Sequence, residues 1–420
     1  MSKTVTIAII GAGARGRGYA NFAKEFPERL KVVAVAEPND YYRELVAREH
    51  NIAPENCFKS WDEFTARAKM CDAVAICTQD SMHEAPAIAC AGLGYHILLE
   101  KPMAPTAEAC QRIVAAVKKA GVMFAVCHVL RYTKYTAVLR DIIASGEIGD
   151  IVSIQHLEPV GYWHQAHSFV RGLWRNEAES SFMLLAKSCH DVDWLRGVMG
   201  KKCVAVHSFG SLKHFKASEK PAGAADRCVN CPTRIESNCP YSAVKIYFRD
   251  RFCKGVKHWP VNVLTPNPTD ETLEKALVDG SYGRCVYACD NDVVDNQVVN
   301  MSFEDGSTVS MTMTAFNFHG GRKTRIFGTK GEIDTDSTII TVNHFLDNTS
   351  RVVDTDTLND GGILSGHGGG DMGLMNNFVQ AVAENDPSLI LTGIDETLES
   401  HLMVFAAEKS RKEGIVVEIK

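Results

Sequence analysis

The chain has 420 residues, of which 45% are hydrophobic and 23% are charged. This composition indicates a globular protein with room for two domains. The formal net charge of −6 argues against nucleic acid and anionic membranes as partners, because basic surfaces bind both. No apolar run is long enough to span a membrane. The 14 cysteines, without a secretion-signal layout at the start of the chain, favour a reducing, cytoplasmic location.

The first expected element is a strand at residues 5–10, an apolar run that leads directly into a glycine-rich turn. The turn, Gly11-Ala-Gly13-Ala-Arg-Gly16, fits G-x-G-x-x-G. Its first glycine permits the tight turn, its second allows close approach of a pyrophosphate, and its third allows the next helix to pack on the strand. The helix start at Ala14 and Arg15 then offers free amide groups to phosphates. The motif therefore predicts a dinucleotide site.

A second apolar run, at residues 32–36, ends in Glu37. A carboxylate at this strand end can accept hydrogen bonds from a ribose 2′-hydroxyl and repels a 2′-phosphate. Glu37 therefore favours NAD over NADP as the cofactor.

Strands and helices alternate through the first third of the chain. Further apolar runs occupy residues 73–77, 97–99 and 122–127. The clearest helical pattern covers residues 106–120 and ends before Gly121, a C-cap residue. Such alternation predicts a parallel, doubly wound Rossmann sheet over residues 1–127. Because ligands bind at the carboxyl edge of such sheets, the polar residues that follow the strands should converge there, namely Gly11, Glu37, Thr78, Gln79, Glu100, Lys101 and His128.

Residues 128–420 have a different pattern and are predicted to form a second domain. A helix and a turn at residues 131–151 lead into it. Longer, partly alternating runs predict antiparallel strands at residues 151–157, 296–303, 308–315, 325–327 and 339–342. Residues 213–290 are rich in Cys, Pro and Lys and are interpreted as an insertion. Apolar residues at helical spacing predict two closing helices, marked by Met375, Phe378, Val379 and Val382 and by Leu398, Leu402, Phe405 and Ala406.

These residues together resemble the glucose–fructose oxidoreductase/inositol dehydrogenase/MocA family over nearly the whole chain. The motifs that carry the resemblance are Gly11–Gly16, Thr78 with His83, Glu100-Lys101-Pro102, Arg131-Tyr132, Gly146-Glu-Ile-Gly149 and Gly328-Thr-Lys-Gly331. The resemblance implies an α/β fold, with a Rossmann domain and a C-terminal α/β domain that has a large, mostly antiparallel open sheet. It also implies homo-oligomers, dimers or tetramers, built through that sheet, and hydride transfer on sugars or inositols.

The resemblance also implies residue roles. Thr78, His83 and Glu100 join the cofactor-binding set, and Lys101 is expected between the nicotinamide and the substrate hydroxyls. The family's second acid–base element is an Asp and a His four residues apart on a helix. His190 matches the histidine, but Ala186 stands in place of the Asp. Lys187 shares a predicted helix face with His190 and is either a catalytic participant or the ion-pair partner of Asp191.

A stretch rich in aromatic, His and Arg residues is the candidate carbohydrate site, since aromatic faces and fixed donors bind sugars. Its members are Glu158, Tyr162, Trp163, His164, His167, Arg171, Trp174 and Arg175, and Arg131 is added to them. A metal at His164 and His167, or a structured loop around a buried Trp, are the alternatives. His367-Gly-Gly-Gly-Asp371 is a further candidate substrate contact, with Asp371 alternatively a helix N-cap.

Three cysteines of the insertion, Cys228, Cys231 and Cys239, lie within twelve residues. With Cys285 or Cys253 as the fourth ligand they form a candidate structural zinc site, which would stabilise a segment with little apolar core. The alternative is free thiols in a loop. Since all-cysteine sites are usually closed, a catalytic zinc is not expected.

Three functions remain open. The first is an NAD-dependent oxidoreductase acting on a sugar, glycoside or cyclic polyol. The second is an NAD-dependent glycosidase that oxidises a hydroxyl transiently, eliminates the aglycone, adds water and returns the hydride. The missing Asp and the stretch at residues 158–175 fit that reaction. The third is a non-catalytic NAD(H)-responsive binding protein, against which the presence of both Lys101 and His190 argues.

Overall fold

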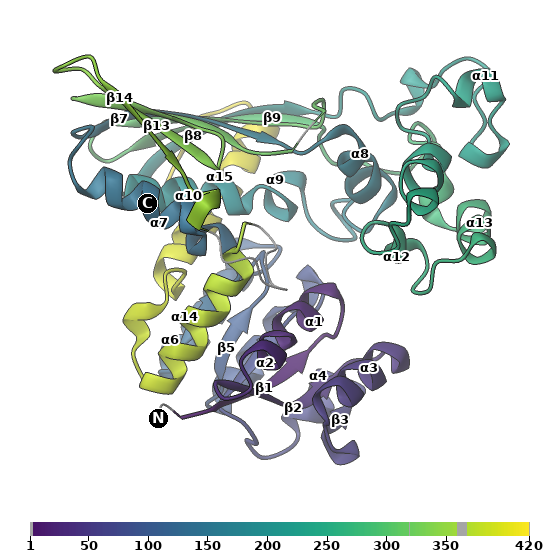
Figure 1. Ribbon diagram of the computed structural model, residues 1–420, viewed down its shortest axis with the longest axis horizontal. Coiled ribbons are helices and arrows are strands. Elements are labelled where there is room, and N and C mark those ends of the chain that lie inside the picture. The colour runs from purple at the N-terminus through teal and green to yellow at the C-terminus, as the bar shows by residue number, and fades with distance from the viewer. Residues whose placement is uncertain (1–2, 319, 359–367, 420) are drawn as a thin grey trace.

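The computed structural model describes residues 3–318, 320–358 and 368–419 and contains two sheets, one above the other in Figure 1. The N-terminal sheet has six parallel strands in the order β3-β2-β1-β4-β5-β6. This is the strand order of a dinucleotide-binding Rossmann fold. Its strands are β1 (Val5–Ile10), β2 (Leu30–Ala36), β3 (Cys57–Phe58), β4 (Ala73–Ile76), β5 (His96–Leu99) and β6 (Phe124–Val126).

Helices cover both faces of this sheet because its strands are apolar on both sides. They are α1 (Ala14–Ala20), α2 (Phe22–Glu25), α3 (Asp40–His50), α4 (Trp61–Thr65), α5 (Glu84–Gly92) and α6 (Ala107–Ala120). Helix α6 begins and ends as its sequence predicts. The side chain of Thr106 caps its N-terminus, and Gly121 takes the left-handed conformation after its last residue.

The second sheet has nine strands in the order β14-β13-β12-β11-β7-β10-β9-β8-β15. Among the strands of the described residues, the β7–β10 pair alone is parallel, and the other pairs are antiparallel. The strands are β7 (Ile151–Pro159), β8 (Cys203–Ser211), β9 (Asn296–Phe303), β10 (Thr308–Thr314), β11 (Lys323–Gly328), β12 (Gly331–Thr335), β13 (Ile339–His344), β14 (Ser350–Asp354) and β15 (Val417–Glu418). The α/β fold with a mostly antiparallel second sheet is therefore confirmed.

Helices pack on one face of the large sheet, the lower face in Figure 1. They are α7 (Lys134–Ala144), α9 (Met183–Ala186), α10 (Cys189–Met199) and α15 (Ile394–Glu413). The other late helix, α14 (Gly370–Glu384), returns to the N-terminal domain. Its Leu374, Met375 and Phe378 belong to the apolar core formed with β1 and β2. A segment late in the chain thus completes the Rossmann core.

Residues 212–295 lie between β8 and β9, on the right in Figure 1, and include the segment 213–290 that was interpreted as an insertion. It contains α11 (Thr233–Glu236), α12 (Val261–Leu264) and α13 (Asp270–Asp279). Contrary to the expectation from its composition, the insertion has an apolar core, which includes Phe215, Tyr247, Leu273 and Val286. Helix α8 (Tyr162–His164) and a π-helix at Gln165–Arg171 join this core to β7.

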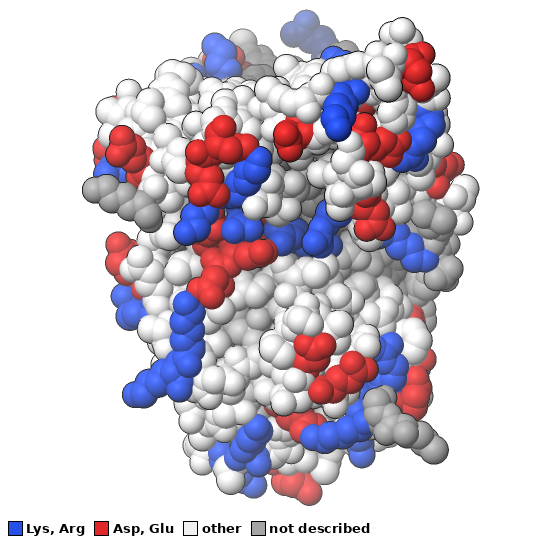
Figure 2. Space-filling view, turned by 90° about the vertical axis from the view of Figure 1, so that its left-hand side faces the viewer, with Lys and Arg blue, Asp and Glu red and all other residues white. Residues whose placement is uncertain are grey.

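On the face drawn in Figure 2, Lys and Arg side chains lie among Asp and Glu side chains. This mixture agrees with the small net charge of −6. No helix within the described ranges has the length and apolar composition that crossing a membrane requires.

Candidate active site

The glycine-rich turn has the geometry of a pyrophosphate cradle. Gly11 has a φ of 90°, and a Cβ built on it would lie 2.6 Å from the carbonyl oxygen of Cys77. A Cβ on Gly16 would lie 2.0 Å from the carbonyl oxygen of Gly11, whereas a Cβ on Gly13 would meet no atom within 4 Å. The first and third glycines are thus required by the protein's own packing. The second leaves open space beside the backbone, where a phosphate can approach.

Glu37 is held against this turn by the backbone. Its Oε2 accepts a hydrogen bond from the amide of Ala12 at 2.7 Å, and its Oε1 accepts one from the amide of Asn39 at 2.8 Å. Each carboxylate oxygen keeps a further lone pair for a ligand hydroxyl. The residues present therefore fit an NAD ribose beside a pyrophosphate.

Arg15 and Glu100, expected at the cofactor, form an ion-pair network with Asp371. Arg15 lies 2.6 Å from Glu100 Oε1 and 2.6 Å from Asp371 Oδ1, and Tyr19 donates to Glu100 at 2.6 Å. Burial disfavours the Glu100 carboxylate, but Arg15 and Lys101 outweigh burial and hold its pKa below the usual range. Asp371 lies in the first turn of α14, and Gly369 occupies the N-cap position. The alternative of an Asp371 N-cap is therefore wrong, and the network joins the fingerprint helix to α14.

His83 joins the ends of β4 and β5. Its ring nitrogens lie 2.8 Å from the carbonyl oxygen of Pro102 and 3.1 Å from that of Thr78, and the side chain is fully buried. Glu100 accepts a hydrogen bond from the amide of Lys101 at 2.9 Å. These contacts fix the backbone on both sides of Lys101.

Lys101 reaches across to the second domain. Its Nζ donates a hydrogen bond of 2.7 Å to the carbonyl oxygen of Ala186, the last residue of α9. At the position where the family pattern has a carboxylate side chain, this chain thus offers a backbone carbonyl. The ammonium keeps two further donors for a ligand.

His190 lies beside a second histidine, His128. His190 lies in the first turn of α10, and its ring centroid is 5.6 Å from that of His128, which follows β6. Burial lowers the pKa of His128 to about 3, with Arg131 and Lys101 adding to the effect. His128 was noted in the sequence only as a residue after a strand. The structure brings it together with Lys101 and His190.

Lys187 pairs with Glu158 rather than with Asp191, so the alternative of a Lys187–Asp191 ion pair is wrong. Its Nζ lies 3.1 Å from Glu158 Oε1. Helix α9 ends at Ala186 and α10 begins at Cys189, so Lys187 and His190 do not share one continuous helix.

Asp191 is fully buried, and its partners are Arg322 and His156. Arg322 also lies 3.1 Å from Glu158 Oε2. Burial disfavours the Asp191 carboxylate, yet Arg322 and His156 hold its pKa below the usual range. No pattern in the sequence marks Arg322 or His156 as partners of this site.

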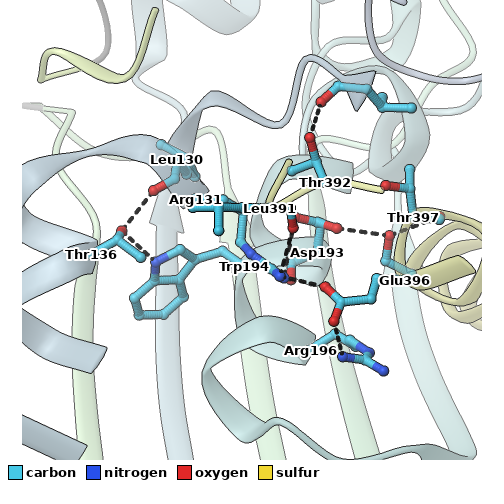
Figure 3. Close-up of polar contacts among 12 residues, drawn as sticks. Leu130, Arg131, Thr136, Asp193, Trp194, Arg196, Leu391, Thr392, Glu396 and Thr397 are labelled. Atoms are coloured by element: carbon cyan, nitrogen blue, oxygen red, sulfur yellow. Dashed lines mark hydrogen bonds and ion pairs between the residues drawn. The ribbon is translucent and has the colours of Figure 1, made fainter. Parts of the chain in front are cut away.

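Arg131, expected at the substrate, is instead part of the packing between helices. Figure 3 shows its guanidinium between Asp193 and Glu396. It donates to Glu396 Oε2 at 2.6 Å and to the carbonyl oxygens of Asp193 and Leu391 at 3.1 and 3.0 Å. A Cβ on Gly197 would lie 2.0 Å from its Nη1. The buried arginine therefore ties α10 and α15 together.

The stretch at residues 158–175 divides between the site and the insertion. His164 is near enough to Lys187 that, after burial, this lysine further lowers its pKa. His167 is buried, with its Nδ1 2.9 Å from the hydroxyl of Tyr247. Within the described ranges no group of three or more His, Cys, Asp or Glu side chains is placed to hold a metal ion, so the metal alternative at His164 and His167 is not supported.

Arg171, Trp174 and Arg175 were expected at the substrate. The arginines instead fix the insertion, whereas Trp174 packs against the core of the large sheet. Arg171 is buried and donates to the carbonyl oxygens of Arg284 and Tyr241, each at 2.7 Å. Arg175 forms an ion pair with Asp290 at 3.0 Å, and Trp174 packs against Phe169. His367 lies outside the described residues.

The zinc prediction is not supported either, although Cys228, Cys231, Cys239 and Cys285 line one small cavity of about 20 Å³. Cys228 Sγ instead lies 3.6 Å from Nη2 of Arg171. Burial raises the pKa of Cys239 and of Cys285.

Both domains match a known family. Residues 5–128 match the NAD-binding Rossmann fold of the Gfo/Idh/MocA oxidoreductase family, and residues 140–419 match its C-terminal alpha/beta domain. The chain belongs to the Gfo/Idh/MocA oxidoreductase family. The predicted family resemblance and the NAD-binding Rossmann domain are thus confirmed.

Among its relatives is the oxidoreductase YteT of Bacillus subtilis, which is 23% identical over 345 residues, covering 78% of this chain and 76% of YteT. The 2,7-anhydro-N-acetylneuraminate hydratase of Escherichia coli is 27% identical over 197 residues, covering 47% of this chain and 50% of the hydratase. A solved structure of levoglucosan dehydrogenase with NADH superposes with a TM-score of 0.72 at 19% identity, covering 99% of both chains. This last similarity shows the fold.

Proposed function

We propose that the protein transfers a hydride between a hydroxyl-bearing carbon of a sugar, glycoside or cyclic polyol and NAD(H). The observation that carries this proposal is the 2.7 Å contact between Lys101 Nζ and the Ala186 carbonyl oxygen. That contact holds an ammonium at the carboxyl edge of the NAD-binding sheet, next to the helix that bears His190. The relatives that are oxidoreductases and the fold shared with a sugar dehydrogenase support the same class.

Oxidation of an alcohol requires a hydride acceptor and a group that takes the hydroxyl proton. The nicotinamide, when bound, supplies the acceptor. In this proposal Lys101 binds the reacting oxygen and stabilises the negative charge that develops on it. His190 accepts the proton, and Lys187, fixed by the buried carboxylate of Glu158, binds a neighbouring hydroxyl.

A second candidate is a glycosidase that uses NAD without net oxidation of its substrate. One relative is named a hydratase, and addition of water leaves the oxidation state unchanged overall. In this reaction a hydroxyl is oxidised, the aglycone is eliminated, water adds, and the hydride returns. The departure at Ala186 favours keeping this candidate, because the usual carboxylate partner of the family is replaced by a carbonyl.

One experiment separates the two candidates. The purified protein is incubated with NAD⁺ and a panel of free sugars, inositols and chromogenic glycosides, while NADH absorbance and aglycone release are followed together. NADH that accumulates without aglycone release supports the dehydrogenase. Aglycone release that requires NAD⁺ but leaves no net NADH supports the glycosidase. If neither signal appears with any compound, both candidates are contradicted.

A further inference from the structure

The insertion carries an exposed tryptophan that packs on the aromatic stretch after β7. The ring centroid of Trp259 lies 5.3 Å from that of Trp163, 5.1 Å from that of His164 and 5.5 Å from that of His167. The side chain is nevertheless 43% exposed, whereas Phe215 and Tyr247 of the same insertion are buried. A large apolar ring left accessible beside other aromatic rings is typical of a ligand-binding surface.

Trp163 is fixed by a cation. The guanidinium carbon of Arg251 lies 4.0 Å from the centroid of the Trp163 ring, and Arg251 also donates to the carbonyl oxygen of Ile246 at 2.8 Å. Such a cation–π contact holds the indole in place. Trp163 and Trp259 thus form an ordered aromatic wall, and Trp259 is its solvent-accessible ring.

The sheet places this wall beside the candidate active site. Strands β7 and β10 are parallel with Pro159 opposite Thr314, so the segments that follow them leave the sheet at the same edge. Asn317 joins the two segments, because its carbonyl oxygen accepts from the amide of Tyr162 at 3.1 Å and its side chain accepts from the amide of Gly161 at 2.8 Å. Glu158, one residue before the end of β7, holds Lys187.

His164 connects the wall to Lys187. Burial lowers the pKa of His164 first, and Lys187, which pairs with Glu158 of the preceding strand, lowers it further. Trp259 contacts His164 on the insertion side. Trp259 and Lys187 thus act on the same histidine from different elements, the insertion and the segment between α9 and α10.

We propose that Trp259 and Trp163 form a subsite that stacks on a second ring of the substrate, so that the preferred substrate is a glycoside rather than a free monosaccharide. This inference rests on the proposed function at Lys101. The C–H face of a pyranose, or a planar aglycone, is apolar and matches an indole face. The insertion thereby sets which carbohydrates are bound, while the two family domains carry out the reaction.

The test compares matched ligands on the NADH-saturated protein by isothermal titration calorimetry. The probes are glucose, galactose and N-acetylglucosamine, their 4-nitrophenyl glycosides, and a disaccharide of each. The wild type should bind at least one glycoside or disaccharide at least tenfold more tightly than its parent monosaccharide. Trp259→Ala should remove that advantage and leave monosaccharide affinity within twofold. Trp259→Phe should retain most of it. Phe345→Ala, an exposed aromatic in the turn after β13, is the control that should change nothing.

Two results overturn the subsite. One is a wild type that binds no glycoside or disaccharide more tightly than the parent sugar. The other is a Trp259→Ala variant that keeps the whole advantage. If the 4-nitrophenyl glycoside binds more tightly than the disaccharide, the wall stacks on a planar aglycone. If the disaccharide binds more tightly, the wall stacks on a second sugar ring. Calorimetry measures binding without turnover. If the subsite binds as proposed but the protein transfers no hydride, only the proposed function is contradicted.

Discussion

The contact between Lys101 and Ala186 is the single residue pair on which the candidate active site depends. It joins the end of β5 in the NAD-binding sheet to the end of α9 in the second domain. Lys101 was expected at the site from its Glu-Lys-Pro motif, but its partner was not. A backbone carbonyl can be supplied by any residue type, so no sequence pattern marks it.

Replacement of Lys101 by alanine should abolish turnover. Without the ammonium, nothing on this strand end stabilises the developing oxyanion, so we expect kcat to fall by about 1,000-fold or more. NADH affinity, measured by fluorescence titration, should stay within threefold because the cradle at Gly11–Gly16 is untouched. Lys24→Ala, a surface ion-pair lysine, is the control. Full activity in Lys101→Ala would place the reaction elsewhere.

Three buried histidines make the free energy of unfolding depend on pH. Burial lowers the pKa of His128, His167 and His401 to about 3, whereas unfolding returns each imidazole to a pKa of about 6.5. Between these values the unfolded chain binds more protons, so stability falls as the pH falls from 6.5 towards 3. At pH 5 each histidine should cost about 2 kcal/mol relative to pH 7.

Urea unfolding at pH 7 and pH 5 checks this expectation. His401 is the most direct probe, because its Nε2 accepts a hydrogen bond from the amide of Met103 at 2.9 Å. Protonation of that nitrogen would remove the acceptor. The variant His401→Gln should therefore show a smaller loss of stability between the two pH values than the wild type. If both proteins lose the same free energy of unfolding between pH 7 and pH 5, His401 does not have the lowered pKa.

At the scale of elements, the strand–turn–helix at the start of the chain offers a matched pair of substitutions. Gly16 and Gly18 both lie in α1. A Cβ on Gly16 would lie 2.0 Å from the carbonyl oxygen of Gly11, whereas a Cβ on Gly18 meets no atom within 4 Å. Both glycines lie in the same helix, but Gly16 alone of the two is packed against the backbone of the turn.

We expect Gly16→Ala to weaken NADH binding at least tenfold and to lower the free energy of unfolding by about 2 kcal/mol, because the helix must move away from the turn. Gly18→Ala should keep NADH affinity and raise the free energy of unfolding by about 0.5–1 kcal/mol, as alanine favours a helix. Fluorescence titration and urea unfolding measure both effects. Equal behaviour of the two variants would be inconsistent with the packed turn.

The elements that sequence patterns predicted well are those with a clear apolar period. Residues 5–10, 106–120 and 296–303 have almost the observed bounds of β1, α6 and β9. Strands β8 and β14 were missed because their apolar faces are weak. Phe209 of β8 and Val352 of β14 are exposed, so burial does not impose an alternating pattern on either strand.

At the scale of the whole molecule, contacts in the site and in the packing around it join residues far apart in the chain. Arg15 and Asp371 are separated by 356 residues, and Arg131 and Glu396 by 265. One sequence contains no signal for such pairs. Arg131 was expected at the substrate for its residue type, and Asp371 for its residue type and for the three glycines before it. The same types equally suit buried ion pairs, and the fold decides between the two.

The large sheet also bears on assembly. One of its faces is covered by helices (Figure 1), and its strands carry exposed apolar side chains such as Val204, Phe209 and Val352. We expect these to be covered in a dimer or tetramer, since exposed apolar patches favour association. Light scattering after size exclusion should give a mass of two or four chains, and Phe209→Lys should lower it. A wild-type mass of one chain at micromolar concentration would contradict this expectation.

The most direct test of hydride chemistry at Lys101 is isotope transfer. The protein is incubated with NAD⁺ and with sugars, glycosides and inositols deuterated at their hydroxyl-bearing carbons, and the extracted cofactor is analysed by mass spectrometry. We predict that at least one compound transfers deuterium to the nicotinamide in the wild type and not in Lys101→Ala. In the dehydrogenase the label accumulates in the reduced cofactor. In the redox-cycling glycosidase the deuterium returns to the substrate, so the reaction is quenched during turnover and the label is sought in the cofactor that is reduced at that moment. A cofactor that stays unlabelled with every compound would contradict hydride transfer by this protein.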